Sequence, residues 1–253
     1  MGYEGETIDV AKTIETLKDA AKRDGFSCGQ TTYKGNFPQL VLQRKATKSD
    51  RLILISSGIH GDEPAGPLSI LQLLEESRLS HELSWLIFPI LCPENLSANR
   101  RECADGADPN RDYRNPQTAE IQSQVEWIAK HNPAIDTALL LHEDWESKGY
   151  YLYEQVTYEG RSFAPEMRHV VSPICGINKL SEIEGMPAED GLISLRGASP
   201  FMQEWPESVY IMRRGAIRSY TLEAPSAMPL EKRVAAHIAA VNATQQALLP
   251  RVT

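Results

Sequence analysis

The chain has 253 residues, of which 42 % are hydrophobic and 24 % charged, and its formal net charge is −8. This composition is typical of a globular protein, and the length suits one large α/β domain. The acidic balance argues against nucleic acid and anionic membrane surfaces as partners. The sequence contains no run of about 18 apolar residues, so no transmembrane helix is predicted.

The N-terminus and the cysteines bear on the cellular compartment. Residues 1–6 are acidic and lack an apolar core, which predicts that no signal peptide is present. The cysteines lack C-x-x-C spacing and are Cys28, Cys92, Cys103 and Cys175. We therefore expect reduced structural thiols in a cytoplasmic protein.

Helices and strands alternate in the first half of the chain. Apolar spacing predicts helices over residues 9–22 and 64–76, the second with a proline near its first turn, where proline fits best. Short apolar runs predict strands over residues 40–42 and 52–57, joined by a polar turn. The uncharged run 83–91 is typical of a strand in the middle of a sheet.

The alternation continues after a long polar segment. Residues 93–115 are Arg-rich and irregular, and they are too many for a simple connection. Helical spacing resumes over residues 116–131, and strands are expected at 135–141 and 150–153. Residues 157–215 are rich in Pro and Gly, which favours loops and short elements. The last expected elements are a strand at 219–223 and a helix at 229–249.

Strands that alternate with helices indicate an α/β fold. We expect a single domain over residues 1–253, with a mixed, mostly parallel central β-sheet covered by helices on both faces. In such sheets, ligands bind outside the carboxyl ends of the strands. Polar side chains at or just past strand ends are therefore the first candidates for a functional site.

The most informative motif follows the strand predicted at 52–57. His60 and Glu63 stand three residues apart in the stretch I-H-G-D-E-P, close to one helical turn, so both side chains can face the same point. An imidazole and a carboxylate are two of the three protein ligands in a His₂Glu zinc site, which leaves the fourth position open for chemistry. The pattern H-x-x-E is common, so its meaning depends on the remainder of the chain.

Two polar residues at later strand ends complete the arrangement. His142 follows the strand at 135–141 and can supply the second imidazole. Glu223 ends the strand at 219–223, and a carboxylate on a rigid strand in a partly dry cleft suits a general base. The remaining histidines, which we assign to surface or core, are His81, His131, His169 and His237.

Arginines concentrate between the two candidate histidine ligands, although the chain as a whole is acidic. They stand at positions 100, 101, 111 and 114. The planar guanidinium fork of Arg binds carboxylates through two parallel hydrogen bonds. A solvated basic loop held by neighbouring aspartates such as Asp105, Asp108 and Asp112 is the alternative interpretation.

The order of these motifs resembles that of the zinc carboxypeptidase family, of the carboxypeptidase A type. It is most similar to the small bacterial branch that includes the murein tripeptide amidases, and the resemblance spans residues 52–225. It implies that His60, Glu63 and His142 bind one zinc ion (Zn²⁺) and that Glu223 is the general base. Glu143 and Asp144 are competing carboxylates, either of which could orient a histidine ligand.

The resemblance also implies roles for the Arg-rich segment. The family pattern G-x-D-x-N-R matches residues 106–111, with Pro109 where leucine or alanine is more usual. Asn110 and Arg111 would bind the free carboxylate of the substrate. Arg101 would stabilise the oxyanion, with Arg100 as its competitor and as a further substrate-binding candidate.

Two features of the substrate pocket stay open at this point. The family has a tyrosine upstream of the base, and the candidates here are Tyr150, Tyr151, Tyr153 and Tyr210. Residues 180–212 are expected to build the pocket for the terminal side chain. Charged residues of both signs in or beside this region are Glu182, Glu184, Asp190, Arg196, Arg213 and Arg214.

These interpretations predict a zinc metallocarboxypeptidase or amidase that acts on a small peptide, murein-type peptides included, with a free carboxylate. One alternative is a deacylase of N-acyl amino acids, similar to succinylglutamate desuccinylase and aspartoacylase. Those enzymes carry a β-rich domain after the catalytic glutamate, whereas residues 224–253 read as a helix here. The other alternative is a catalytically silent metal-binding module. Zinc content and hydrolysis of a carboxypeptidase ester would separate these hypotheses.

Overall fold

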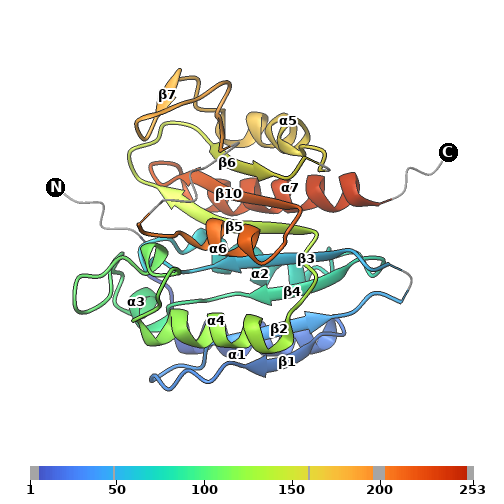
Figure 1. The fold of residues 1–253 in the computed structure, drawn as a ribbon, viewed down its shortest axis with the longest axis vertical. Coiled ribbons are helices and arrows are strands. Elements are labelled where there is room, and N and C mark those ends of the chain that lie inside the picture. Colours follow the sequence, from blue (N-terminus) through green and yellow to red (C-terminus); the bar gives the residue numbers. More distant parts are fainter. Residues whose placement is uncertain (1–5, 48, 159, 196–202, 250–253) are drawn as a thin grey trace.

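One eight-stranded mixed sheet organises the chain (Figure 1). The computed structural model describes residues 6–47, 49–158, 160–195 and 203–249. The strand order is β1-β2-β4-β3-β5-β10-β6-β9, and β7 and β8 pair separately. The strands are β1 (Ser27–Gln30), β2 (Leu40–Arg44), β3 (Leu52–Ser57), β4 (Ser84–Phe88), β5 (Thr137–Asp144), β6 (Tyr151–Val156), β7 (Glu182–Ile183), β8 (Met186–Pro187), β9 (Leu192–Ser194) and β10 (Arg218–Pro225).

The four central strands, β4, β3, β5 and β10, run parallel to one another. Antiparallel strands flank them, with β2 beside β4 on one side and β6 beside β10 on the other. The expected mixed, mostly parallel sheet is thereby confirmed. Because the carboxyl ends of parallel strands meet at one edge, residues at the ends of β3, β5 and β10 come together there.

Helices cover both faces of the sheet (Figure 1). One face packs against α1, α2, α5 and α7, and the other packs against α4 and α6. Successive strand residues point to opposite faces, so Leu139 of β5 joins the first apolar cluster and Leu140 joins the second. The helices are α1 (Val10–Arg23), α2 (Ala65–Glu75), α3 (Pro93–Ser97), η1 (Pro109–Arg111, a 3₁₀ turn), α4 (Ala119–His131), α5 (Ala164–Cys175), α6 (Glu207–Arg213) and α7 (Leu230–Leu248).

Local sequence signals set several helix boundaries close to the predicted ones. The Asp9 carboxylate accepts a hydrogen bond from the Lys12 backbone N–H at 3.0 Å and so satisfies a donor at the start of α1. α4 ends at Asn132, which adopts the left-handed conformation with φ 42°. α7 begins immediately after Pro229 and agrees with the expected helix to within one residue at each end.

The structure differs from the sequence expectation in several places. β4 stops at Phe88 because Pro89 cannot donate to the strand ladder. The same strand lies between β2 and β3, so the polar turn joins strands that are not paired. β5 continues to Asp144, which places His142 inside the strand rather than after it. The segment 157–215, expected to hold only short elements, includes the twelve-residue helix α5.

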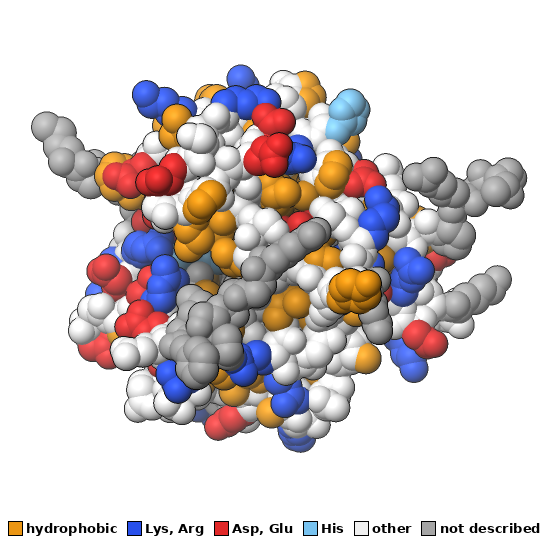
Figure 2. All heavy atoms as spheres, turned by 45° about the horizontal axis from the view of Figure 1, so that its top comes forward, with side chains coloured by type: hydrophobic (Ala, Val, Ile, Leu, Met, Phe, Trp, Pro, Cys, Tyr) orange, Lys and Arg blue, Asp and Glu red, His pale blue; other side chains and the backbone are white. Residues whose placement is uncertain are grey.

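Within the described residues, none of the helices has both the length and the apolar run needed to span a bilayer. Figure 2 shows one face of the molecule, where hydrophobic side chains gather toward the middle and charges of both signs surround them. The predictions made for residues 1–5 and for Arg196 concern positions outside the described residues.

Candidate metal centre

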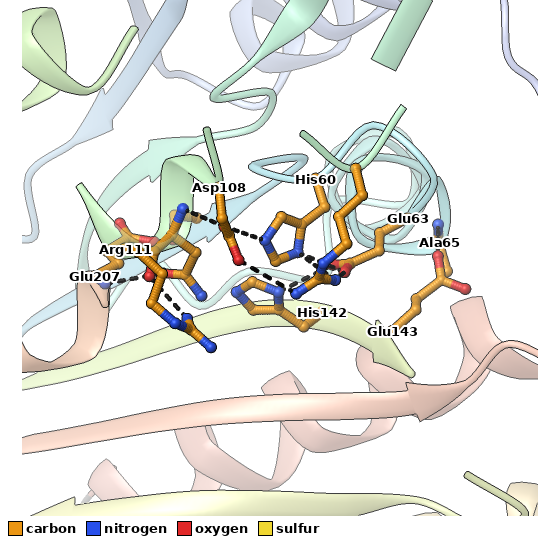
Figure 3. A network of polar contacts seen from close by, with 11 residues as sticks. His60, Glu63, Ala65, Asp108, Arg111, His142, Glu143 and Glu207 are labelled. Carbon is orange, nitrogen blue, oxygen red and sulfur yellow. Dashed lines mark hydrogen bonds and ion pairs between the residues drawn. The ribbon is translucent and has the colours of Figure 1, made fainter. Parts of the chain in front are cut away.

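His60, Glu63 and His142 converge at the carboxyl edge of the sheet. The first two lie in the turn between β3 and α2, and His142 lies near the end of the neighbouring strand β5. All three are buried, and one ligand atom from each lies within 4.8 Å of the others. Figure 3 shows the three side chains pointing toward one another.

The donor atoms of this group fit a cation. The Nδ1 atom of His60 lies 2.6 Å from Glu63 Oε1, and the Nδ1 atom of His142 lies 3.0 Å from Glu63 Oε2. Glu63 Oε2 is buried without a hydrogen bond of good geometry in the described part of the chain. Two imidazole nitrogens and a carboxylate, buried and facing one another, form the donor set typical of a catalytic zinc site.

In the H-x-x-E turn, the backbone at Gly61 lies very close to the backbone of the segment that holds Asn95 and Arg100. A Cβ atom at Gly61 would lie only 2.0 Å from the carbonyl oxygen of Asn95 in α3. The Gly61 N–H donates to the Arg100 carbonyl oxygen at 2.8 Å. Glycine at this position therefore lets the Arg-rich segment lie directly against the turn that carries His60 and Glu63.

Charges in the centre shift the pKa values of its members. Burial alone would raise the pKa of Glu63, but His60 and His142 outweigh that effect and hold it well below its usual range. Burial opposes the charged form of His60, whereas Glu63 and Asp108 raise the pKa of His60 to about 9. Because an imidazole must be deprotonated at its ligating nitrogen, protons and a metal ion compete for this site.

Asp108 orients His60 from the side opposite Glu63. Its Oδ1 atom lies 3.1 Å from His60 Nε2 and also accepts the Asn110 backbone N–H at 2.8 Å, which starts the turn η1. A carboxylate on the second ring nitrogen fixes the tautomer and the orientation of a histidine ligand. The sequence suggested no role for Asp108 beyond a charged loop, although Asp108 is the aspartate of the G-x-D-x-N-R pattern.

The two candidate arginines behave differently. Arg101 NH1 lies 3.2 Å from His60 Nδ1 and 3.3 Å from Glu63 Oε1, so its guanidinium faces the centre. Arg100 is exposed and contributes its backbone carbonyl to the Gly61 contact. Of the two, Arg101 therefore has the position that an oxyanion-stabilising group needs, and that role stays a prediction.

Glu223 lies beside His142 on the neighbouring parallel strand. The two residues are partners in the register of β10 and β5, so their side chains point to the same face. Glu223 is half-buried, and its carboxylate makes no hydrogen bond within the described residues. Burial, with Glu63 and Asp144 adding to it, raises the pKa of Glu223 to about 8 against the lowering effect of His142.

The competing carboxylates take other positions. Glu143 points to the opposite face of β5, where its Oε1 atom accepts the Ala65 backbone N–H at 2.6 Å (Figure 3). Its Oε2 atom pairs with Arg233. Glu143 therefore does not contact the ring of His142, contrary to one hypothesis from the sequence. Asp144 lines the cavity in front of the metal-ligand candidates and accepts a hydrogen bond from the Tyr151 hydroxyl at 3.0 Å.

A cavity of about 570 Å³ opens in front of the centre. The metal-ligand candidates share its lining with Arg101, Asn110, Arg111 and Glu223. Its further walls include Tyr151, Tyr153, Met186, Leu195, Val209 and Thr221. The expected contribution of residues 180–212 is thus seen in the described part of that segment.

The structure shows which of the candidate tyrosines and charged residues line this cavity. Tyr151 and Tyr153 line it, whereas the hydroxyl groups of Tyr150 and Tyr210 contact His237 and the Val125 carbonyl. Among the described charged residues proposed for the pocket, Glu184 lines it. The others are engaged or placed elsewhere, with Arg213 over the Trp205 ring, Arg214 on Asn132, Asp190 on Lys179 and Glu182 in β7.

Asn110 and Arg111 stand at the edge of the same cavity. Asn110 is buried in η1, and its Oδ1 atom accepts the Glu207 backbone N–H at 2.9 Å. The Arg111 side chain is exposed and donates to the Asn110 carbonyl oxygen at 2.9 Å. Pro109 occupies the first position of this turn, where its missing N–H costs nothing, so the unusual residue in the motif is compatible with the local fold.

Comparison with known proteins agrees with this architecture. No family model matches the chain. The crystal structure of a proposed metallopeptidase from Shewanella amazonensis is similar over 96 % of this chain and 94 % of that chain, with a TM-score of 0.84 and 24 % identity. A metallo-carboxypeptidase from Pseudomonas aeruginosa, in complex with (2-guanidinoethylmercapto)succinic acid, has a TM-score of 0.71 and 13 % identity over 97 % of this chain and 70 % of that one.

A curated relative points the same way. Carboxypeptidase 2 of Trichophyton equinum is 25 % identical over 204 residues, which cover 72 % of this chain. The matched region spans only 36 % of that relative's length. The chain therefore has the fold of the metallocarboxypeptidases with a His-Glu-His group in position to bind a metal ion, and the resemblance noted in the sequence is confirmed at that level.

Proposed function

We propose that this protein is a zinc-dependent metallocarboxypeptidase or amidase, which hydrolyses the C-terminal amide bond of a small peptide, murein-type peptides included. The observation that carries the proposal is the shared lining of one cavity. The three buried metal-ligand candidates, a glutamate that makes no hydrogen bond to the described residues and two arginines all border it. The names of the fungal relative and of the Pseudomonas neighbour support the same class of reaction.

His60, Glu63 and His142 would hold the ion, since together they offer three ligands and leave a position open toward the cavity. A zinc ion held there would polarise a scissile carbonyl and acidify a water molecule. Asp108 would keep His60 in the tautomer whose Nδ1 lone pair faces the ion.

Glu223 would take the proton from the attacking water and return it to the leaving amine. Its raised pKa makes its carboxylate a stronger base, and a cation beside it would favour the deprotonated form that a base requires. Arg101 would donate hydrogen bonds to the oxygen of the former carbonyl as negative charge develops on it.

Asn110 and Arg111 would select the last amide bond by anchoring the free carboxylate. The Asn110 side chain is fixed through its Oδ1 atom, which leaves its amide N–H groups to donate. Arg111 would add a guanidinium fork, and fixing the carboxylate at a set distance from the ion determines which bond is cleaved.

A digest of a peptide library by the zinc-loaded protein, read by mass spectrometry, tests this proposal. The library should contain murein tripeptide, N-acyl amino acids and peptides with amidated C-termini. Release of single C-terminal residues from free acids is the expected result. Cleavage restricted to N-acyl amino acids would establish the deacylase alternative, and stoichiometric zinc without any cleavage would establish a silent module.

A further inference from the structure

A second buried polar group lies on the other face of the sheet, directly behind the metal centre. It consists of Glu143 in β5 and Arg233 in α7, whose side chains form an ion pair. Glu143 is 5 % exposed and Arg233 is 0 % exposed. Removing two charges from water is costly, so a buried pair is stable only where further hydrogen bonds satisfy both partners.

Those further hydrogen bonds lead to the segments that carry the metal-site residues. The other oxygen of Glu143 accepts the N–H of Ala65, which is the first residue of α2 and stands two residues after Glu63 (Figure 3). The Nε atom of Arg233 donates to the Met228 carbonyl at 2.9 Å, in the segment that follows β10. Glu143 itself is adjacent to His142.

One ion pair therefore connects three segments that are distant in the sequence. These are the H-x-x-E turn, the end of β5 and the exit of β10, which carry the metal-ligand candidates and Glu223. The Glu143 carboxylate also meets the N-terminus of α2, where negative charge is favourable. On the N-terminal side, Arg233 pairs with Glu6 as well.

We propose that Glu143 and Arg233 are a positioning pair, which holds these three segments at the spacing that metal binding requires. The inference rests on the metal site of the proposed function. Glu143 is among the residues that line the cavity, but both charged side chains are 0 % exposed and the Glu143 carboxylate is held by Ala65 and Arg233. The pair would therefore act through His142 and Glu63. Support of this kind around a metal site is typically worth about 10–100-fold in metal affinity.

The chain offers a matched control in a second buried ion pair. Arg44 NH1 lies 3.0 Å from Asp24 Oδ2, and these side chains are 7 % and 2 % exposed. Arg44 is opposite Trp85 near the start of β4, at the amino edge of the parallel strands. Breaking this pair should weaken the fold without reaching the metal centre.

The experiment compares Arg233→Met with Arg44→Met. Zinc affinity is measured by competition with a chelator in the absence of substrate, and the melting temperature of the zinc-free protein is recorded in parallel. We expect both variants to melt earlier than wild type. Zinc affinity should fall about 10–100-fold in Arg233→Met and stay within about twofold of wild type in Arg44→Met.

Two results would overturn the inference. Wild-type zinc affinity in Arg233→Met would show that the pair does not position the ligands, and equal losses in both variants would show a general effect of instability. If Arg233→Met does not fold, Glu143→Gln takes its place with the same two criteria, because glutamine can still accept the Ala65 N–H. A wild-type protein that binds no zinc would instead refute the proposed function itself.

Discussion

Two buried carboxyl groups lie on opposite faces of the sheet near the candidate metal centre, and their partners differ. Glu143, on the side of α7, is paired with a cation, Arg233. Glu207, on the side of the cavity, has neutral partners, since its two oxygens accept from the Ser56 hydroxyl and the Gln124 amide, each at 2.7 Å. Figure 3 shows the two groups on either side of His142.

The two carboxyl groups also support different parts of the site. Glu143 contacts the start of the helix that follows Glu63, whereas the backbone N–H of Glu207 fixes Asn110. The proposed metal ligands and the proposed carboxylate anchor thus contact different buried carboxyl residues. Metal binding, chemistry and substrate anchoring should therefore be separable by single substitutions.

The largest effect is expected from His60→Ala. Two remaining ligands cannot hold a zinc ion at the site, so stoichiometric zinc and hydrolysis should both be lost. Metal analysis of the purified variant and an assay of C-terminal residue release provide the readouts. A variant that keeps one zinc per chain would remove His60 from the ligand set.

Glu223→Gln should separate chemistry from metal binding. Glutamine keeps the shape of the side chain but cannot take a proton, so turnover should fall roughly 10²–10⁴-fold while zinc content stays at the wild-type level. Steady-state kinetics and metal analysis on the same sample test this. Turnover near the wild-type rate would transfer the role of base to another group, with Asp144 the first to examine.

Arg101→Ala should lower kcat with little change in KM. The contact of Arg101 with the substrate oxygen strengthens only as negative charge develops, and the loss of one such donor typically costs about 10²–10³-fold in kcat. The neighbouring Arg100→Ala is the control, because that exposed side chain does not line the cavity. Equal losses in both variants would contradict the assignment of Arg101.

Arg111→Lys should affect the anchoring half alone. Lysine keeps the charge but loses the fork, and a hydrogen bond to a charged group is worth about 1.5–3 kcal/mol, so KM for free-acid peptides should rise roughly 10–100-fold. Peptides with an amidated C-terminus should change little. Arg114→Lys, on the same segment but outside the cavity lining, is the control.

The smallest expected effect concerns pH and Glu207. Burial raises the pKa of Glu207 above its ordinary value of 4.5, against the lowering effect of Ser56 and Gln124. The folded protein then keeps a proton that the unfolded chain releases, so this group loses stabilising effect as pH rises from 4.5 toward its folded pKa.

Glu207→Gln removes that titration. The free energy of unfolding of the variant should vary less steeply over this pH range than that of wild type, by at most about 1.4 kcal/mol per pH unit. Urea unfolding at several pH values measures both slopes. Identical slopes would show that Glu207 titrates in the folded protein as it does in the unfolded chain.

The central sheet and the metal-ligand candidates could be predicted from the sequence because both depend on local patterns. Apolar runs marked β3, β5 and β10, and the H-x-x-E spacing marked the turn after β3. The helix α5 escaped because Pro165 and Pro173 obscure it, although its buried residues Ala164, Met167, Val171 and Cys175 keep a helical spacing. The two prolines misled the prediction. Pro165 lies in the first turn of α5, where proline is well tolerated, and Pro173 lies near its end.

Contacts between distant segments could not be predicted in the same way. Glu143 and Arg233 are 90 residues apart, and nothing local to either residue indicates the other. The positions of Arg100 and Arg101 likewise depend on contacts with a distant segment, since the Arg100 carbonyl accepts the Gly61 N–H and the Arg101 guanidinium lies beside His60. Such pairings follow from strand order and loop paths, which periodicity does not encode.

In the proposed function, a carboxylate anchor directs a metal-dependent reaction to the last amide bond. The most direct measurement is hydrolysis of one peptide in two forms, with a free C-terminal carboxylate and with an amidated C-terminus, by the zinc-loaded wild-type protein. We predict release of the terminal residue from the free acid, no comparable cleavage of the amide, and loss of the release from the free acid after a chelator removes the zinc. Equal cleavage of acid and amide, or cleavage that persists without the metal, would contradict the account.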